Sequence, residues 1–226
     1  MTDTDIIELK NVDSEDIGDV LVKIEKSFDI KFGATELKDV KTFGELCDII
    51  TSKIVLDIIE DCTTQQAFYK LRNAIAVIDR LDKNFIQPET DLENIFPKHA
   101  RRQKISLLEN ELAFSLKILR PKHWVTTTFV LILLASIVAV FFFWQVGLTG
   151  LLLSIGGLKL SDKFGKELDL KTVGELVDKI SREHYFKARR NTGTVNKKEV
   201  AEKITKLFIN DLDLHPSVLT RDATFR

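Results

Sequence analysis

The sequence predicts an all-α protein organised around one long apolar segment. Residues 124–158 form a run of 35 consecutive residues without a formal charge. On both sides of this run, apolar side chains recur at the spacing of helices with one buried face. No segment alternates apolar and polar residues for long enough to predict a strand.

The apolar run is predicted to lie in a membrane. A bilayer core of about 30 Å needs about 20 apolar residues per helical crossing, so the run is long for one crossing and tight for two. The competing interpretation is a buried helix of a soluble protein. A chain of 226 residues rarely encloses so long an uncharged helix, so we favour the membrane.

Charge is distributed unevenly along the chain. Residues 1–61 hold 16 Asp and Glu against 7 Lys and Arg, and positive charge gathers at 98–122 and 159–190. The acidic part argues against nucleic acid as a partner. The basic clusters beside the apolar run are expected to face anionic lipid on the cytoplasmic side of the membrane.

Few residues suggest catalysis or metal binding. Cys47 and Cys62 lack metal-ligand spacing and suit a reducing compartment, and the four histidines show no paired spacing. The acidic start of the chain has no apolar core and is not a secretory signal, so the apolar run is expected to direct insertion. We predict no catalytic residue, no metal and no enzymatic activity.

Two helices are predicted before residue 55. The first opens at Asp13 or Ser14 as N-cap, buries a stripe from Ile17 to Phe28 and ends at residues 32–34. The second opens with a capping box, in which Thr42 is the N-cap and Glu45 is the N3 residue.

Three further helices are predicted outside the apolar run, over 64–81, 99–119 and 197–212. In the middle one, Arg101, Arg102 and Lys104 are expected to point outward. As charges on an exposed helix, Arg101 and Arg102 are more simply solvated residues or lipid anchors than a specific binding site.

An internal repeat connects the two sides of the apolar run. Residues 170–180, LKTVGELVDKI, repeat residues 40–50, VKTFGELCDII, at an offset of 130. The repeat includes the capping box, so the same capped helix is expected twice.

Residues 13–32, DSEDIGDVLVKIEKSFDIKF, resemble the second helix of the acyl carrier protein family. That family has Asp-Ser-Leu before an amphipathic helix that ends in a Glu-x-x-Phe-like signature, and its closing helix begins with a Thr-x-Gly motif, as at Thr42. The resemblance implies that Ser14, preceded by Asp13, carries 4′-phosphopantetheine. Glu15 stands where the family has leucine, and the alternative is that Ser14 is only an N-cap.

The resemblance implies two small helical bundles in an unusual chain order. Residues 11–55 match the second half of such a bundle, and 197–226 resemble its first half, so the two ends complete one bundle within a chain or between chains of a homo-oligomer. Residues 64–122 with 160–185 give a second, degenerate bundle. Aligning Glu109 with Glu25 places Lys98, which cannot be modified, at the position of Ser14.

The second bundle would contain the apolar run, 124–158, as an inserted transmembrane hairpin. Both flanks of the run then lie on one side of the membrane: 124–143 crosses, 144–147 turns and 148–160 returns. The return segment is short, so tilted, re-entrant and partly interfacial placements stay open.

Two functions follow from these interpretations. The first is a membrane-anchored carrier that presents an acyl group from Ser14 to acyl-transfer or lipid-synthesis enzymes, with Asp16, Asp19 and Glu25 docking on their basic surfaces. The second is an unmodified carrier-like scaffold that recruits partner proteins to the lipid bilayer. For both we expect a bacterial inner membrane, with the soluble parts in the cytoplasm.

Overall fold

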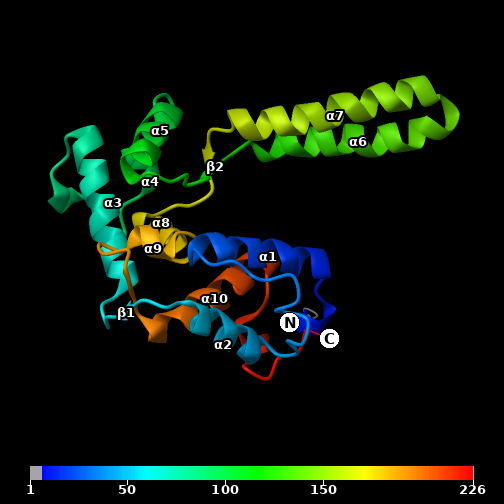
Figure 1. Ribbon diagram of the computed structural model, residues 1–226. Helices are drawn as coiled ribbons and strands as arrows, with labels where there is room; N and C mark the ends of the chain where they lie inside the picture. Colours follow the sequence, from blue (N-terminus) through cyan, green and yellow to red (C-terminus); the bar gives the residue numbers. More distant parts are fainter. Residues whose placement is uncertain (1–6, 226) are drawn as a thin grey trace, which may run out of the picture. The chain divides into compact units, whose positions relative to one another are not determined.

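A computed structural model of the chain describes residues 7–225 (Figure 1). In these residues the protein is 63% helix, with ten α-helices and a few two-residue strands, which confirms the all-α prediction. The chain folds as two compact units. The first contains the residues up to Asn73 together with those from Leu176 onward, and the second contains Ala74–Glu175.

The first unit takes its helices from both ends of the chain. Its longest helices are α1 (Ser14–Ser27), α2 (Phe43–Lys53) and α10 (Lys197–Leu212). The short helix α9 (Tyr185–Ala188) belongs to the same unit. The division between the units passes through α3 (Thr63–Asp79) and α8 (Val173–Glu183). Strands β1 (Asp57–Ile58) and β4 (Thr194–Val195) pair in parallel, and the 3-10 turns are Leu9–Asn11 and Pro216–Val218.

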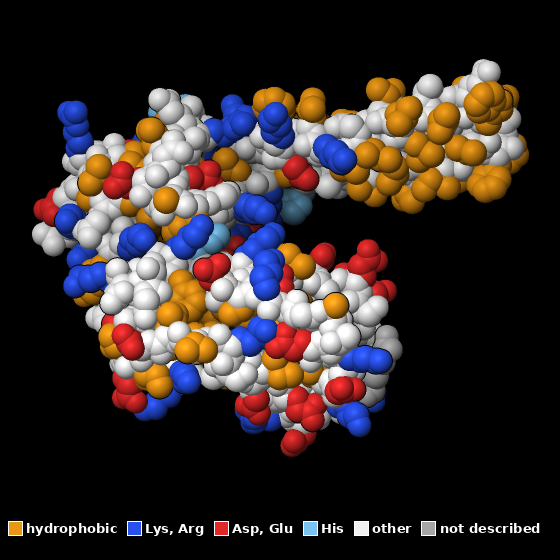
Figure 2. Space-filling model, viewed as in Figure 1, with side chains coloured by type: hydrophobic (Ala, Val, Ile, Leu, Met, Phe, Trp, Pro, Cys, Tyr) orange, Lys and Arg blue, Asp and Glu red, His pale blue; other side chains and the backbone are white. Residues whose placement is uncertain are grey.

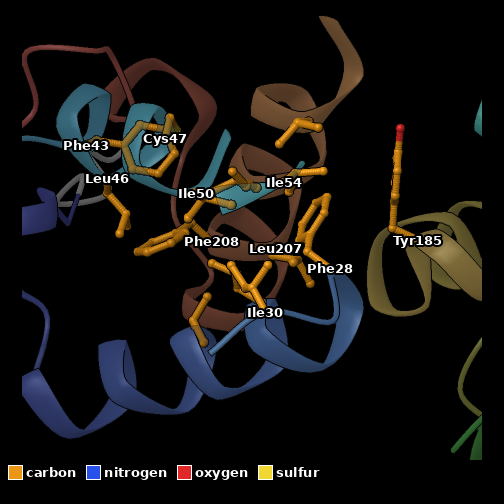
Figure 3. Packing of buried hydrophobic residues seen from close by; sticks show 14 of the residues in the cluster. Phe28, Ile30, Phe43, Leu46, Cys47, Ile50, Ile54, Tyr185, Leu207 and Phe208 are labelled. Carbon is orange, nitrogen blue, oxygen red and sulfur yellow. The ribbon is translucent and has the colours of Figure 1, made fainter. Parts of the chain in front are cut away.

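One apolar core joins these segments (Figure 3). Phe28 at the end of α1 stacks on Tyr185 with ring centroids 5.1 Å apart, and Phe43 of α2 meets Phe208 of α10 edge to face at 5.2 Å. Cys47 and Leu207 lie in the same cluster. Since each fully buried large apolar side chain contributes about 1.5–3 kcal/mol, this shared core holds the two ends of one chain together.

The second unit contains the two longest helices of the described chain, α6 (His123–Phe142) and α7 (Trp144–Phe164). It also contains the 3-10 turn Lys83–Phe85, α4 (Leu92–Ile95) and α5 (Arg101–Leu112). Strands β2 (Leu119–Arg120) and β3 (Glu167–Leu168) pair antiparallel, so the chain enters and leaves α6 and α7 at neighbouring points.

Helices α6 and α7 run antiparallel, side by side, and we call this pair the arm (Figure 1). The prediction that residues 144–147 form the turn is wrong, because α7 already begins at Trp144 and Phe143 alone connects the helices. Gly147 is needed for close packing instead: a Cβ there would lie 2.4 Å from the backbone nitrogen of Val140.

In the part of the chain that the structure describes, one helix is long and apolar enough to cross a membrane. This helix is α6, with a mean hydropathy of 2.6, and only 6% of its most apolar window is buried. The rest of the described chain therefore does not enclose α6, as it would enclose the core helix of a soluble protein. Figure 2 shows hydrophobic side chains spread over the outer surface of the arm.

Two predicted helix ends are corrected. Helix α1 ends at Ser27 rather than at 32–34, and α5 ends at Leu112 rather than near residue 119. In both places a left-handed residue follows, Asp29 with φ 45° and Ala113 with φ 61°, which breaks the helix. Apolar residues continue past both breaks, so periodicity alone could not locate them.

The two breaks are built in the same way. The Glu25 carboxylate accepts the backbone N–H of Phe32 at 2.8 Å, and the Glu109 carboxylate accepts that of Leu116 at 2.7 Å. The offset between the two breaks is 84 residues in each case: from Glu25 to Glu109, from Phe32 to Leu116, and from Asp29 to Ala113. A chain reversal closed by the same carboxylate-to-backbone hydrogen bond thus occurs in each unit.

The capping boxes form a second matched pair. The Glu45 carboxylate accepts from Thr42 N at 3.1 Å and Glu45 N donates to Thr42 Oγ1 at 3.2 Å. The corresponding distances for Thr172 and Glu175 are 3.4 and 3.2 Å. The predicted capping box at Thr42 is confirmed, and its repeat forms the same structure.

The segment facing each capping box is the third matched pair. Gly44 N donates to Arg221 O at 2.8 Å, and Gly174 N donates to Pro88 O at 2.7 Å. Phe225 N donates to Lys41 O at 3.1 Å, as Leu92 N does to Lys171 O at 2.8 Å. In the first unit this segment lies at the carboxyl end of the chain, whereas in the second it precedes α5, so the segment order differs while the contacts agree.

Candidate functional site

The candidate site is the amino terminus of α1. Asp13 is the N-cap, and its carboxylate accepts the backbone N–H of Glu15 at 2.9 Å. Ser14 is the first residue of the helix and is exposed to solvent. The two N-cap alternatives are therefore resolved in favour of Asp13, and the hydroxyl of Ser14 is not the capping acceptor.

A cavity of about 720 Å³ opens beside Ser14. Its apolar lining comes from α1, from the loop before α2, from α2 itself and from the carboxyl-terminal segment. Lys10, Lys38 and Lys41 add positive charge to a lining that also includes the carboxylate of Asp13. The apolar lining residues are Val12, Ile17, Leu21, Leu37, Val40, Leu46 and Phe225.

The carboxyl-terminal segment forms one wall of this cavity. Phe43 N donates to Ala223 O at 2.8 Å, and Thr42 and Thr224 form a β-bridge. The ring of Phe225 lies 6.2 Å from that of Phe208, which attaches the wall to the core. Sequence reasoning placed this segment in the same bundle but did not identify Phe225 as a cavity residue, because a contact 211 residues from Ser14 leaves no local pattern.

The three predicted docking carboxylates differ in their surroundings. Asp16 and Asp19 are exposed on α1. Glu25 is held by the N–H of Phe32 and by Lys31, whose ammonium lies 2.9 Å from its carboxylate. These hydrogen bonds, led by that of Phe32, hold the pKa of Glu25 below its ordinary value. Asp16 and Asp19 are therefore the carboxylates free to meet a partner.

The second unit has a cavity in the matching place. It measures about 390 Å³, and six of its lining positions correspond to lining positions of the Ser14 cavity. The correspondences are Ile17 with Arg101, Leu37 with Glu167, Lys38 with Leu168, Val40 with Leu170, Lys41 with Lys171, and Thr224 with Asp91.

Arg101 is the side chain that changes this second cavity. The prediction that it points outward is wrong: Arg101 is 1% exposed. Its guanidinium donates to Phe96 O at 2.8 Å, to Lys166 O at 2.7 Å and to the Glu93 carboxylate at 3.1 Å. Arg101 is the first residue of α5, and its side chain reaches back to one carbonyl before the arm and one after it. The interpretation of Arg101 as a solvated surface charge is therefore wrong. Arg102 remains half-buried.

Lys98, the counterpart of Ser14, is exposed near the same network. Its ammonium lies 3.9 Å from the Glu93 carboxylate and 3.8 Å from that of Glu167. The second cavity thus has ion pairs where the first has apolar side chains and a serine. Leu168 and Leu170 also line this cavity, but a hydrocarbon chain bound there would remove the solvation of the charged groups of Glu93, Glu167 and Lys171.

The two cysteines differ in accessibility. Cys62 is exposed, whereas Cys47 lies in the core of the first unit, where burial raises the pKa of its thiol to about 12. Cys47 is thus a core residue, and its thiol is inert as a nucleophile.

Comparisons with protein-family models, with curated proteins and with solved structures found no match to this chain.

Proposed function

We propose that this protein is a membrane-anchored, acyl-carrier-like protein whose carrier site is Ser14. The observation that carries the proposal is the position of Ser14. It is an exposed serine on the first turn of a 14-residue helix, beside a largely apolar cavity of about 720 Å³ with three lysines in its lining. A phosphate ester at a helix amino terminus is favoured by the helix dipole and by the free N–H groups.

The residues of the cavity fit a phosphopantetheine group with an acyl chain. Lys10, Lys38 and Lys41 offer positive charge to the phosphodiester, and the apolar side chains around Ile17 and Leu46 offer a dry surface for hydrocarbon. When bound to Ser14, the group would supply a thiol that holds the acyl chain as a thioester. The protein itself would orient the group and shield the chain from water.

The finer architecture belongs to the same proposal. The first unit is a carrier-like bundle in permuted order, which α10 and the carboxyl-terminal segment complete within the chain. The second is a degenerate bundle with Lys98 in place of the serine. The three matched sets of backbone hydrogen bonds support this reading, since each lies at the same place in both units.

The arm would carry the membrane anchor, as a hairpin with both ends on one side. The exposed carboxylates of Asp16 and Asp19 would then dock on basic patches of acyl-transfer or lipid-synthesis enzymes at the bilayer surface. Such charge complementarity speeds encounter and makes it sensitive to salt.

Intact-mass measurement tests the carrier site. The full chain is co-expressed with a phosphopantetheinyl transferase of broad specificity, and we expect a mass increase of one phosphopantetheine group. The increase should be absent in Ser14→Ala and kept in the control Ser52→Ala, which removes another exposed serine hydroxyl in the same unit.

Glu15→Leu sharpens this test, because leucine is the residue of the acyl carrier protein family at that position. We expect this variant to be modified faster than the natural chain. If neither chain gains mass while an ordinary carrier in the same cells does, the carrier proposal is wrong. The unmodified scaffold, with α1 as a protein-binding face, would then be the better reading.

A further inference from the structure

The packing of the arm fixes which residues of its two helices lie at the same level. A Cβ at Gly150 would lie 2.2 Å from Ser136 Oγ, and one at Gly157 would lie 2.1 Å from the ring of Phe129. Gly147 likewise lies against Val140, so three close contacts between the helices define one antiparallel register along the whole arm. The buried hydroxyl of Ser154, like that of Ser136, is satisfied within its own helix.

Continuing this register brings the charged residues of both helices together. Beyond Gly157, Lys159 falls about level with Thr127, and Lys163 falls about level with His123. The charges of α7 therefore lie beside the beginning of α6, at the end where β2 and β3 join the arm. We call this end the open end. From there to the turn at Phe143, neither helix carries a charge.

The open end has an excess of positive charge. Asp169 is paired with Arg120 at 2.8 Å, and Glu167 lies near Lys98 and Arg101, which leaves Asp162 as the acid on the last turn of α7. Figure 2 shows lysine and arginine side chains at this end of the arm. Within the described chain, four exposed lysines at this end form no ion pair with an acid: Lys122, Lys159, Lys163 and Lys166. The guanidinium of Arg102 lies over the ring of Phe164 at 5.1 Å.

The other end of the arm has the opposite character. Phe141, Phe142, Phe143 and Trp144 are 83, 76, 70 and 65% exposed, and no charged residue lies near them in the sequence. Aromatic residues of this kind suit hydrocarbon and the interface beyond it. The arm is thus polarised, with cations at one end and aromatic rings at the other.

We propose that the open end of the arm is a binding surface for anionic phospholipid headgroups. Phosphate groups of the lipid would lie against Lys159, Lys163 and Lys166, and this contact would fix the direction in which the arm enters the bilayer. Lys159 lies about one turn inside Lys163, so its long side chain would reach outward to the headgroups while its stem stays in hydrocarbon. The inference rests on the membrane anchor of the proposed function and adds the lysines that contact the headgroups and the direction in which the arm enters the bilayer.

Vesicle flotation of the full chain tests this surface. Protein synthesised without membranes is added to vesicles of phosphatidylcholine alone or with phosphatidylglycerol. Because each Lys or Arg near an anionic surface adds to the attraction, we expect partitioning to be about tenfold higher with phosphatidylglycerol. Lys159→Gln/Lys163→Gln/Lys166→Gln should abolish that difference.

The matched control removes three exposed lysines of the first unit, as Lys26→Gln/Lys197→Gln/Lys198→Gln. It should keep the preference for phosphatidylglycerol, with unchanged circular dichroism in both triple variants. Equal flotation with both vesicle types, or equal loss in the control, would overturn the anionic-lipid surface. Absence of flotation with either vesicle would instead overturn the membrane anchor, and neither outcome touches the mass test of Ser14.

Orientation is read from cysteine labelling in a Cys62→Ser background. With protein added from outside, Asp162→Cys at the open end should react with a membrane-impermeant maleimide, and Gln145→Cys near the turn should not. Reaction of Gln145→Cys from outside at the rate of Asp162→Cys would show that the arm does not enter with its aromatic end first.

Discussion

The cavity beside Ser14 and the cavity beside Arg101 occupy matching positions in the two units and differ in the side chains that line them. In the first unit, Ile17 and Leu37 make the lining apolar. In the second, Arg101 and Glu167 stand at these positions and lie 4.0 Å apart. The backbone ties around both cavities agree, so the framework and the lining are specified by different residues.

This difference shows how little of the framework depends on the cavity. The framework needs a capped helix, a glycine against a carbonyl and a glutamate that accepts an N–H after a left-handed residue. None of these groups needs the cavity lining to be apolar. In the first unit this framework surrounds a largely apolar cavity, whereas in the second it holds ion pairs that join α4 and α5 to the base of the arm.

The largest expected effect comes from removing the buried cation of the second unit. Arg101→Leu leaves the carbonyls of Phe96 and Lys166 without their donor, and Glu93 keeps the Lys98 ammonium, at 3.9 Å, as its remaining cationic neighbour. Breaking a buried charged network costs about 3–5 kcal/mol, and because Glu93 is exposed we expect about 3 kcal/mol. Hydrogen exchange of α5 measures this as faster exchange, with α2 of the first unit as the internal reference.

Two comparisons delimit that prediction. Arg102→Leu, at the next position, should change α5 exchange by less than about 1 kcal/mol, since its visible contact is a cation–π pair with Phe164. An Arg101→Leu protein as well protected as the natural chain would mean that the ion-pair network does not hold this unit together.

The two glycines after the capping boxes give a smaller, graded effect. A Cβ at Gly44 would lie 2.8 Å from the backbone oxygen of Arg221, whereas one at Gly174 would lie 3.1 Å from Pro88 O. The carboxyl-terminal segment must shift in the first case, and only a small adjustment is needed in the second. We expect Gly44→Ala to cost about 2 kcal/mol and Gly174→Ala about 1 kcal/mol, in the range of overpacking.

Denaturant unfolding, combined with exchange in α2 and α8, measures both variants. Gly18→Ala is the control, because a Cβ there meets nothing within 4 Å and alanine favours the helix. A larger loss of stability for Gly174→Ala than for Gly44→Ala would contradict the prediction, because it would mean that the shorter Cβ distance at Gly44 does not mark the tighter packing.

The smallest effects are expected at the two glutamates that close the chain reversals. Glu25→Gln and Glu109→Gln each replace a charge-assisted acceptor of a backbone N–H by a neutral one, at a cost of about 1 kcal/mol. Differential scanning calorimetry should show similar losses for both, which would confirm that the reversals are equivalent.

Acid gives an independent measure at Glu25. The pKa of Glu25 is lower in the folded chain than in an unfolded one, so its stabilising contribution is complete above the unfolded glutamate pKa of about 4.3. That contribution is lost as the pH falls through the lower folded pKa. The difference between the natural chain and Glu25→Gln should therefore shrink below about pH 4, and a difference that persisted there would contradict a role for the charge.

Local chemistry in the sequence determined the helices and their caps. Thr42 and Glu45 predicted the capping box because both partners lie within one turn, and the apolar spacing predicted α1, α2, α3 and α10 for the same reason. The uncharged run predicted the helices of the arm, although it did not locate their turn. The repeat at residues 170–180 also identified the second capped helix.

Tertiary structure decided what depends on residues far apart. The burial of Arg101 requires carbonyls at Phe96 and Lys166, and the left-handed breaks at Asp29 and Ala113 follow a helical pattern that continues past them. The helices of the arm turn at Phe143, where no turn sequence stands, and the close approach of Gly147 to Val140 beside it joins residues of both helices.

The candidate site shows the same division. Ser14 lies at the start of α1, and the sequence predicts this helix start from Asp13, Glu15 and Asp16 because capping acts over only a few residues. The cavity beside it exists only where α1, α2 and the segment ending at Phe225 meet. The sequence thus determined the helices and the exposed serine through local hydrogen bonding and hydrophobic spacing. Long-range packing brought the lining residues of each cavity together, and the side chains at those positions made one lining largely apolar and the other charged.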